Sequence, residues 1–282
     1  MNAFVRSLSL GLLLIFTPSL ALAQDRINRL VEKLETGEGV EGVFLNTLEF
    51  NSARATRGSD LDYVIIDMEH HAFDAETLRQ VLVNLRAPDG SFPVTPIVRV
   101  GTPGSEVGQN LWMFKQVLDA GAFGIMVPFV NTAEEAEAAV RAMRYPPVRD
   151  DAAPEPRGSR GWSPAVAADA WNLGVRDYAR RADLWPLDPE GELILVPQIE
   201  TVEGIDNLAD IAAVPGVGAL FIGPADLHAD MGYLGESGVP EVEEEIQRGL
   251  RAADEAGVPI GLTPAGSTLE ERQAQGFRFM TR

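Results

Sequence analysis

Two acidic residues close two apolar stretches in the second half of the sequence. The run LILVPQIE ends in Glu200, the run ALFIGPAD ends in Asp226, and a helical pattern separates them. This order predicts a βαβ unit of a parallel sheet, in which both acids follow neighbouring strands and meet at one rim. Two converging carboxylates suit a hard divalent cation of the Mg²⁺ or Mn²⁺ type. The alternative, a helix N-terminal acid and a turn residue that share no ligand, stays open.

Other reactive side chains also fall at predicted strand ends. An arginine can stabilise developing negative charge, an aspartate can orient a histidine, and a histidine can accept a proton. With a cation, such groups suit metal-assisted chemistry on a carbonyl compound that bears a carboxylate. The residues concerned are Asp67, Glu69 and His70 after one strand, Arg99 on the next, and Gln198 beside the first acid.

Two of these residues have structural alternatives. His70 could be a core histidine with satisfied hydrogen bonds, and the adjacent His71 leaves open which of the two would act. Arg99 is harder to explain without a function, because a cation on an otherwise apolar strand is costly to bury unless it is paired.

Apolar runs alternate with helical patterns along the chain. Eight such runs predict the strand count of a TIM barrel, an α/β fold whose active sites lie at the carboxyl ends of the strands, for one domain over residues 24–282. The chain stops at Arg282, so we expect the last barrel helix to be missing from it. The predicted strands are Val43–Leu45, Tyr63–His70, Pro96–Val100, Gly124–Phe129, Leu193–Ile199, Ala219–Ile222, Pro259–Thr263 and Phe277–Met280. The clearest helices are Arg26–Glu35, one opened by Asp74, Val107–Asp119, Thr132–Arg144, Val239–Ala256 and Ser267–Gln275.

The segment Tyr145–Glu192 breaks this alternation. It is rich in Pro, Asp and Arg and has at most two short helical patterns. Long irregular segments inside a domain are usually lids or insertions, and residues 148–157 are the expected insertion.

Composition and residue usage exclude several functions. The 282 residues carry a formal net charge of −19, which argues against nucleic acid or an anionic membrane as partner. The chain has no cysteine, and its two lysines, Lys33 and Lys115, lie outside the predicted barrel mouth. Disulfides, thiolate ligands and a Schiff-base mechanism are therefore excluded. The sequence also has no nucleophile elbow, P-loop or dinucleotide fingerprint.

Residues 1–23 predict a cleavable signal peptide. Arg6 supplies positive charge, Leu8–Phe16 an apolar run, and Ala21–Ala23 a small-residue cleavage site. The apolar run is short for a membrane span, so we expect a periplasmic or secreted mature protein without a membrane segment. An uncleaved N-terminal anchor is the alternative.

The chain resembles the HpcH/HpaI aldolase/citrate lyase family of metal-dependent class II pyruvate aldolases from about Arg26 to Arg282. The resemblance rests on DYVIIDMEHHAFD, PIVRV, LDAGAFGIMVPFVNTAEEAEAAVRAMRYPP, PQIETVEGIDNL and GVGALFIGPADLHADMGY, which occur in the family's order. It implies a carbon–carbon lyase that reversibly cleaves a 4-hydroxy-2-oxo acid to pyruvate and an aldehyde through a metal-stabilised enolate.

The resemblance also implies a role for each matching residue. Glu200 and Asp226 would hold Mg²⁺, Mn²⁺ or Co²⁺, Gln198 would lie beside the cation, and the turn Gly223–Asp226, with Ala225, would donate N–H groups to the pyruvate carboxylate.

Further matches concern proton transfer and assembly. Arg99 would steady the enolate oxygen, and His70 with Asp67 would handle the proton. Asp119 matches a position that reaches a neighbouring subunit's site in relatives, which assemble as homo-oligomers, commonly hexamers, by exchanging the terminal helix.

The chain departs from the family pattern in places. Residues 148–157 precede the Arg160–Gly161 loop as an insertion, His228 stands where serine is usual, the seventh strand ends in TPAG, and the exchanged helix is absent. Two other functions therefore remain as alternatives. One is a periplasmic binder or sensor of 2-oxo acids without turnover, and the weaker one is a CoA-ester lyase.

Overall fold

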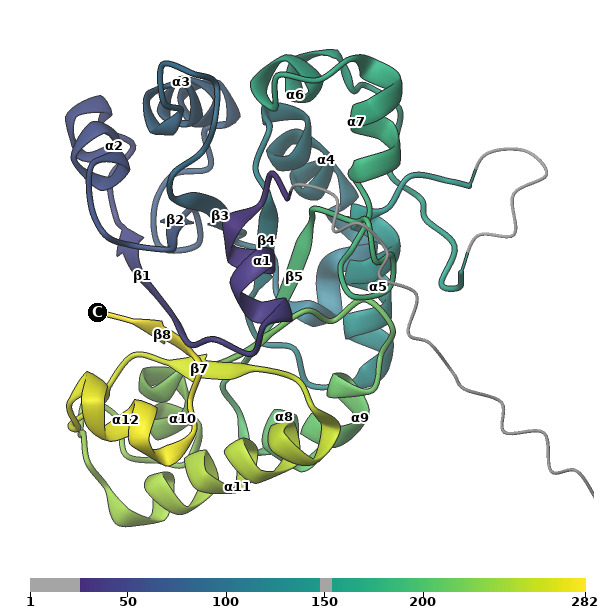
Figure 1. Cartoon of the computed structure of the whole chain (residues 1–282). Helices are drawn as coiled ribbons and strands as arrows, with labels where there is room; N and C mark the ends of the chain where they lie inside the picture. The colour runs from purple at the N-terminus through teal and green to yellow at the C-terminus, as the bar shows by residue number, and fades with distance from the viewer. Residues whose placement is uncertain (1–25, 148–153) are drawn as a thin grey trace, which may run out of the picture.

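The structure, a computed structural model, describes residues 26–147 and 154–282. The predicted signal peptide and most of the predicted insertion, residues 148–153, lie outside the described residues. The described chain forms eight parallel strands with helices around them, which confirms the predicted TIM-type α/β barrel (Figure 1).

The strands form a nearly closed ring. They are hydrogen-bonded in the order β7-β6-β5-β4-β3-β2-β1-β8, and a 2.9 Å bond from the Arg278 N–H to the Ile260 carbonyl joins the two outer strands. Because all neighbours are parallel, the carboxyl ends of the strands share one rim. The strands are β1 Val40–Leu45, β2 Tyr63–Asp67, β3 Thr95–Arg99, β4 Gly124–Val127, β5 Ile194–Ile199, β6 Leu220–Ile222, β7 Ile260–Leu262 and β8 Phe279–Thr281.

Two apolar cores stabilise the ring. Side chains alternate along each strand, so Ile65 and Ile97 fill the barrel interior while Val64 and Val98 face the surrounding helices. The helical segments are α1 Arg29–Glu35, α2 Phe50–Arg57, α3 Ala75–Leu85, η1 Gly104–Gln109, α4 Leu111–Ala120, α5 Ala133–Met143, α6 Ala165–Ala170, α7 Val175–Arg181, α8 Val202–Asp206, α9 Leu208–Ala212, α10 Pro224–Asp230, α11 Pro240–Ala256 and α12 Leu269–Gln275.

Some element boundaries differ from the sequence predictions. The predicted helix Val107–Asp119 is a 3₁₀ segment, η1, followed by α4, and α2 was not predicted. The expected turn Gly223–Asp226 is the start of α10, with Gly223 as its N-cap. β2 ends at Asp67 rather than at His70, so the last three predicted strand residues belong to a loop.

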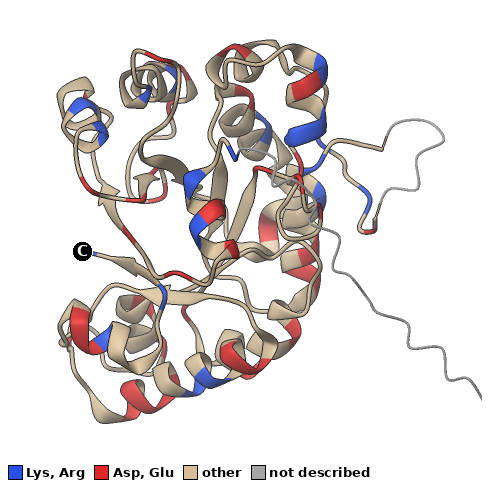
Figure 2. Cartoon of the chain, viewed as in Figure 1, with Lys and Arg blue, Asp and Glu red and all other residues tan. Residues whose placement is uncertain are grey.

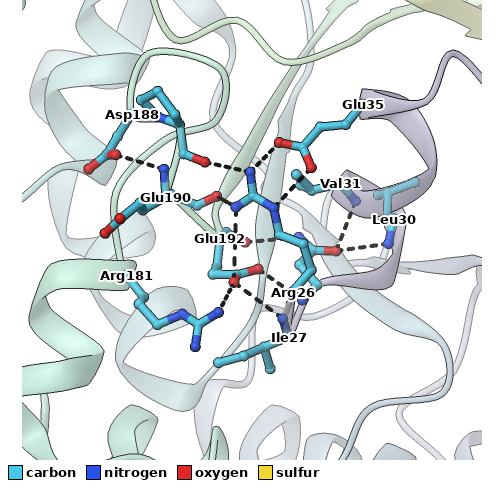
Figure 3. A network of polar contacts seen from close by, with 12 residues as sticks. Arg26, Ile27, Leu30, Val31, Glu35, Arg181, Asp188, Glu190 and Glu192 are labelled. Atoms are coloured by element: carbon cyan, nitrogen blue, oxygen red, sulfur yellow. Dashed lines mark hydrogen bonds and ion pairs between the residues drawn. The ribbon is translucent and has the colours of Figure 1, made fainter. Parts of the chain in front are cut away.

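Helix α1 covers the amino ends of the strands (Figure 1). Its buried residues Leu30 and Val31 belong to the interior core. Glu192, which is fully buried, accepts bonds from the N–H groups of Ile27 and Asn28 at 3.2 and 2.9 Å. Arg181 pairs with the same carboxylate at 2.6 Å (Figure 3). This network fastens the start of the described chain to the segment before β5.

Charge is unevenly distributed over the helices. Acidic residues line α11 (Figure 2). In the described part of the chain, no helix is long and apolar enough to cross a membrane.

Candidate active site

The inward-facing rows of the barrel end in polar side chains at the carboxyl-end rim. Because the side-chain period of a strand is two, the residue two positions after an interior apolar residue also points inward. Ile65 is thus followed by Asp67, Ile97 by Arg99, and Val196 by Gln198, and these three polar residues are buried. On these three strands, the barrel therefore changes from an apolar core to a polar mouth between one inward-facing residue and the next.

Asp67 and Arg99 form the centre of this mouth. They are opposite one another in the β2–β3 register, and two parallel hydrogen bonds of 2.9 Å join the Arg99 Nε and Nη2 groups to the Asp67 carboxylate. The guanidinium carbon lies 4.7 Å from the ring centre of Phe44 on β1. This bidentate pairing and the aromatic contact explain how a charged residue is accommodated in the barrel.

Glu69 is a second carboxylate on the same arginine. Its Oε2 lies 3.0 Å from Arg99 Nη1, and its side chain is 14% exposed. Asp67 Oδ1 also accepts a 3.1 Å bond from the Glu69 N–H, which bends the chain out of β2. Hydrogen bonds to Asp67 use two of the five N–H donors of the guanidinium, and Nη1 faces Glu69 as an ion pair without a hydrogen bond.

Glu200 follows β5 and is fully buried. Its Oε1 accepts a 2.8 Å bond from the Phe129 N–H, and its Oε2 accepts a 2.5 Å bond from Gln198 Nε2. Phe129 has a positive φ of 50°, an unusual backbone conformation for a non-glycine residue, and it aims its N–H at the carboxylate. Gln198 Oε1 is buried and has no hydrogen-bond partner.

Gly223 leaves room for this carboxylate at the start of α10. A Cβ atom at this position would lie 2.1 Å from Glu200 Oε2 and 2.8 Å from Gln198 Nε2. Asp226 lies in the first turn of α10, where a negative charge also interacts favourably with the helix dipole. The βαβ unit therefore places both acids after neighbouring strands at one rim, where the Asp226 carboxylate raises the pKa of Glu200.

The electrostatics of the mouth are dominated by excess negative charge. Burial is the main cause that raises the pKa of Glu200 to about 8; the nearby carboxylates of Asp226 and Glu69 also raise it, and the Phe129 N–H and Arg99 lower it. Burial likewise raises the pKa of Glu69. Burial would also raise the pKa of Asp67, but the hydrogen bonds and charge of Arg99 outweigh it, so this pKa is lowered.

The residues present fit a divalent cation. Glu200 is a buried carboxylate whose raised pKa reports an uncompensated negative charge, and Gln198 Oε1 is an unsatisfied acceptor beside it. No group of three or more His, Asp or Glu side chains in the described residues is arranged to hold a metal ion. The candidate donors are Glu200 and Asp226, and a pair of carboxylates of this kind would need substrate and water to complete the shell of a cation such as Mg²⁺.

The two histidines of the mouth lie in the loop after β2 and are exposed. His71 Nδ1 lies 3.4 Å from Asp67 Oδ2, whereas His70 Nε2 lies 3.7 Å from Glu69 Oε2. His70 is within electrostatic reach of Asp67, since it lowers the pKa of that aspartate. In the described structure, however, the expected dyad partner His70 faces Glu69, and Asp67 contacts Arg99 and His71. The cause is that the chain leaves the strand geometry at Asp67.

Asp119 does not join this mouth. It lies near the end of α4, where it pairs with Arg160 at 2.9 Å and with Lys115 at 3.2 Å. It lines an outer cavity beside α3 and α6. Ala225 is exposed in the first turn of α10.

Several residues of the mouth had no assigned role in the sequence analysis. Glu69 was noted at a strand end, but its pairing with Arg99 depends on the bend after Asp67. Phe44 and Phe129 carry no recognisable signal in the sequence, because their roles arise from a ring face and a backbone N–H. Gly223 was expected only in a carboxylate-binding turn; its close approach to Glu200 had a weak signal, since a glycine directly after a strand often marks such an approach.

The chain is similar to known proteins of one family. The model of the HpcH/HpaI aldolase/citrate lyase family matches residues 41–280, which include every residue of the mouth named above. A solved structure of a family protein from Burkholderia cenocepacia J2315 superposes with a TM-score of 0.76 at 33% sequence identity, covering 90% of this chain and 91% of that chain.

Relatives with an assigned activity are also similar. A hydroxypyruvate/pyruvate aldolase of Agrobacterium fabrum is 40% identical over 236 residues, covering 83% of this chain and 79% of that protein. A 4-hydroxy-2-oxo-heptane-1,7-dioate aldolase of Shigella sonnei is 36% identical over 240 residues, covering 85% of this chain and 81% of that protein.

Proposed function

The chain belongs to the HpcH/HpaI aldolase/citrate lyase family, and from this premise we propose that it is a metal-dependent carbon–carbon lyase acting at the Arg99–Glu200 mouth. It reversibly cleaves a 4-hydroxy-2-oxo acid into pyruvate and an aldehyde, as the names of its relatives support. The observation that carries the proposal is the cluster of three acids, Glu69, Glu200 and Asp226, beside the guanidinium of Arg99.

A divalent cation accounts for this excess of acid. Glu200 and Asp226 would hold it, and Gln198 Oε1, the unsatisfied acceptor, would orient a ligand beside it. When bound, Mg²⁺, Mn²⁺ or Co²⁺ would act as a Lewis acid that polarises the 2-oxo group of the substrate. The cation would also offset the repulsion between the carboxylates and thereby keep Glu200 ionised near neutral pH.

The residues of the mouth would carry the remaining work. Arg99 would offer N–H donors that Asp67 does not use to the oxygen on which negative charge develops when the C3–C4 bond breaks. Asp67 and Glu69 hold its guanidinium in place, so that no reorganisation is needed at that moment. A histidine of the loop after β2 accepts the proton of the 4-hydroxyl group.

Metal dependence and aldol activity are tested together. The protein is treated with EDTA, and pyruvate is then offered with glycolaldehyde, glyceraldehyde or succinic semialdehyde with and without added Mg²⁺, Mn²⁺ or Co²⁺. We expect product only when a cation is restored. Activity that is indifferent to chelation would overturn the metal-dependent mechanism, whereas no product with any aldehyde would overturn the lyase.

A non-catalytic binder of 2-oxo acids is the second candidate, and the predicted signal peptide of residues 1–23 is the observation that favours it. Exchange of the pyruvate methyl protons with D₂O separates the two functions. A lyase exchanges them in the presence of the cation, and a binder does not.

We also propose that the protein is exported. The n-region, apolar run and cleavage site of residues 1–23 support this location. N-terminal sequencing of the protein from a periplasmic fraction should start at Gln24; an intact Met1 in the cytoplasm would refute export.

A further inference from the structure

A fully buried arginine, Arg272, lies in helix α12, outside the barrel mouth. Its Nη1 and Nη2 groups donate hydrogen bonds of 2.6 and 2.8 Å to the two carboxylate oxygens of Glu243, in the first turn of α11. Its Nε group donates a 3.1 Å bond to the carbonyl oxygen of Pro264. Pro264 belongs to the segment that joins β7 to α12, residues 263–268, which we call the β7–α12 loop. Arg272 therefore ties this loop to α11 and α12.

The loop that Arg272 holds has an unusual backbone. Ala265 has a φ of 49°, in the left-handed region that a residue with a side chain rarely adopts, and Gly266 follows with a φ of 89°. The Pro264 carbonyl also accepts a 3.2 Å bond from the Ser267 N–H. A strained conformation of this kind persists only when the surrounding contacts hold it, and the hydrogen bond from Arg272 is one of these contacts.

The β7–α12 loop begins at the barrel mouth. Leu262, the last residue of β7, is opposite Ile222 of β6 in the strand register. The residues that follow these two, Thr263 and Gly223, are therefore neighbours at the carboxyl-end rim. Gly223 lies against the Glu200 carboxylate. The loop thus starts beside the acids that are proposed to hold the cation.

The layering of the mouth decides which part of a substrate this loop can meet. Apolar side chains of the interior core fill the barrel below Arg99 and Gln198. A bound substrate can therefore extend only outward, past the ends of the strands. The carboxylate and keto oxygen of a 2-oxo acid would lie near Glu200 and Asp226. The carbons of the aldehyde half would then lie farther out, among the loops that follow the strands.

We propose that Arg272 is a positioning residue, which fixes the β7–α12 loop as a wall beside the aldehyde half of the substrate. This inference rests on the proposed lyase function, and Arg272 itself touches no substrate. In the condensation direction, C3 of the enolate forms a bond to the aldehyde carbon, the C=O electron pair passes to the aldehyde oxygen, and this oxygen gains a proton. A fixed wall presents one face of the aldehyde to C3, so the loop influences both the affinity for the aldehyde and the configuration at C4.

Arg144 provides a matched control at the other end of the barrel. Its side chain is 3% exposed, it pairs with the carboxylate of Asp183, and it donates to the carbonyl oxygens of Pro154 and Pro156. It ends α5 ahead of β5, so it lies at the amino ends of the strands, away from the mouth. If buried arginines only stabilise the fold, replacing either one should lower the melting temperature and leave the KM for the aldehyde unchanged.

The experiment uses the full chain loaded with the cation, pyruvate and the aldehyde that reacts fastest. We expect Arg272→Lys to raise the KM for the aldehyde by about three- to tenfold, because lysine can keep the ion pair with Glu243 but not the bond to Pro264 as well. The excess of one C4 configuration in the product should fall. Exchange of the pyruvate methyl protons with D₂O, which does not involve the aldehyde, should stay near wild type. Arg144→Lys should change none of these three quantities.

A second variant keeps the test decisive if Arg272→Lys does not fold. Glu243→Gln removes the charge of the partner but keeps an acceptor for the guanidinium, and the Glu243 side chain is 37% exposed. We expect this variant to fold and to show a smaller rise in the same KM. If Arg272→Lys is unfolded, a wild-type KM and C4 configuration in Glu243→Gln would overturn the assignment.

Three results with folded Arg272→Lys would also overturn it. These are an unchanged aldehyde KM and C4 configuration, equal changes in Arg144→Lys, and a parallel loss of pyruvate proton exchange. If the wild type itself gives no product with any aldehyde, the lyase function fails first, and that result is distinct from these three.

Discussion

At the scale of single residues, the mouth is organised by one arginine that serves three purposes. Arg99 neutralises Asp67, forms an ion pair with Glu69 and, in the proposed function, would offer its remaining donors to the substrate. A lysine could supply the charge but not the parallel pair of bonds, because its ammonium group is a point charge on a flexible stem. The planar shape of the guanidinium, as well as its charge, is therefore required.

Two replacements of Arg99 should separate the effect of its positive charge from the effect of its planar guanidinium. We expect Arg99→Lys to lower kcat by roughly 10²-fold, the usual effect of losing one transition-state donor. Arg99→Met should in addition destabilise the fold by about 3–5 kcal/mol, because it leaves the buried Asp67 carboxylate without a partner. Steady-state kinetics and urea unfolding measure the two effects. Equal losses of stability in both variants would contradict this account.

Glu200 should make the stability of the cation-free protein depend on pH. Its pKa is about 8 in the folded chain, above the usual 4.5. Below about pH 4.5 the group is protonated in both states, and between about pH 4.5 and 8 only the folded state holds the proton, so stability falls by up to about 1.4 kcal/mol per pH unit. Above about pH 8 the loss is complete and constant.

The measurement is urea unfolding in EDTA at several pH values, with Glu200→Gln as the matched variant. Glutamine is neutral at every pH and can still accept the bond from Phe129, so its stability should lack this slope. Added Mg²⁺ should reduce the slope of wild type. Parallel curves for the two proteins would show that Glu200 is not the titrating group.

At the scale of elements, the site depends on how closely α10 approaches β5. Gly223 begins α10 directly against the Glu200 carboxylate. The Glu200 carboxylate can therefore keep its position only if the residue between β6 and α10 has no side chain. We expect this close approach to create the proposed ligand site within an otherwise common βαβ unit.

Adding one methyl group at this approach should abolish cation binding. We expect Gly223→Ala to displace Glu200 and Gln198, since its Cβ would lie 2.1 Å from Glu200 Oε2. Gly108→Ala in η1 is the control, because a Cβ there meets nothing within 4 Å. The readout is the rise in melting temperature on adding Mn²⁺, which Gly223→Ala should lose and the control should keep. An unchanged rise in Gly223→Ala would place the cation elsewhere.

The network under α1 should affect stability without affecting chemistry. Glu192→Ala removes the acceptor of the Ile27 and Asn28 N–H groups and the buried carboxylate that pairs with Arg181, so we expect a loss of about 3–5 kcal/mol. Because the network lies at the opposite end of the strands from Arg99, kcat of the folded protein should stay near wild type.

Glu35 provides the matched comparison. It is the other carboxylate on Arg26 (Figure 3), and its side chain is 36% exposed. Glu35→Ala should therefore cost less than about 1 kcal/mol in the same urea unfolding experiment. A similar loss in both variants would show that burial of Glu192 is not the cause.

At the scale of the whole molecule, one residue implied by the family resemblance lies outside the mouth. Asp119 is paired with Arg160 and Lys115 on an outer cavity. A carboxylate on this outer surface can serve an active site only if another copy of the chain docks there. The oligomer implied by the resemblance therefore remains a prediction with a direct test.

Mixing two defective variants provides this test. We expect Asp119→Asn and His70→Asn to be impaired alone and to regain part of the activity when they are unfolded and refolded together, since mixed oligomers would contain some intact shared sites. Light scattering should show an oligomer in each preparation. A monomeric protein, or mixtures that stay at the average of the two variants, would contradict shared sites.

The sequence by itself determined the barrel, its acids and the rim that they share. The strands are buried on both faces, so their apolar runs and the helical patterns between them can be recognised in the sequence without knowledge of tertiary contacts. The order of those runs placed Glu200, Asp226 and Arg99 at carboxyl ends, because all strands of such a barrel are parallel.

Only the tertiary structure decided the pairings. Strand alternation predicts side-chain direction only while the strand continues, and β2 ends at Asp67, so the directions of Glu69, His70 and His71 depend on the loop that follows. The Asp67–Arg99 pair joins residues 32 positions apart. The approach of Gly223 to Glu200 likewise depends on packing, since local sequence preferences do not encode the distance between two elements.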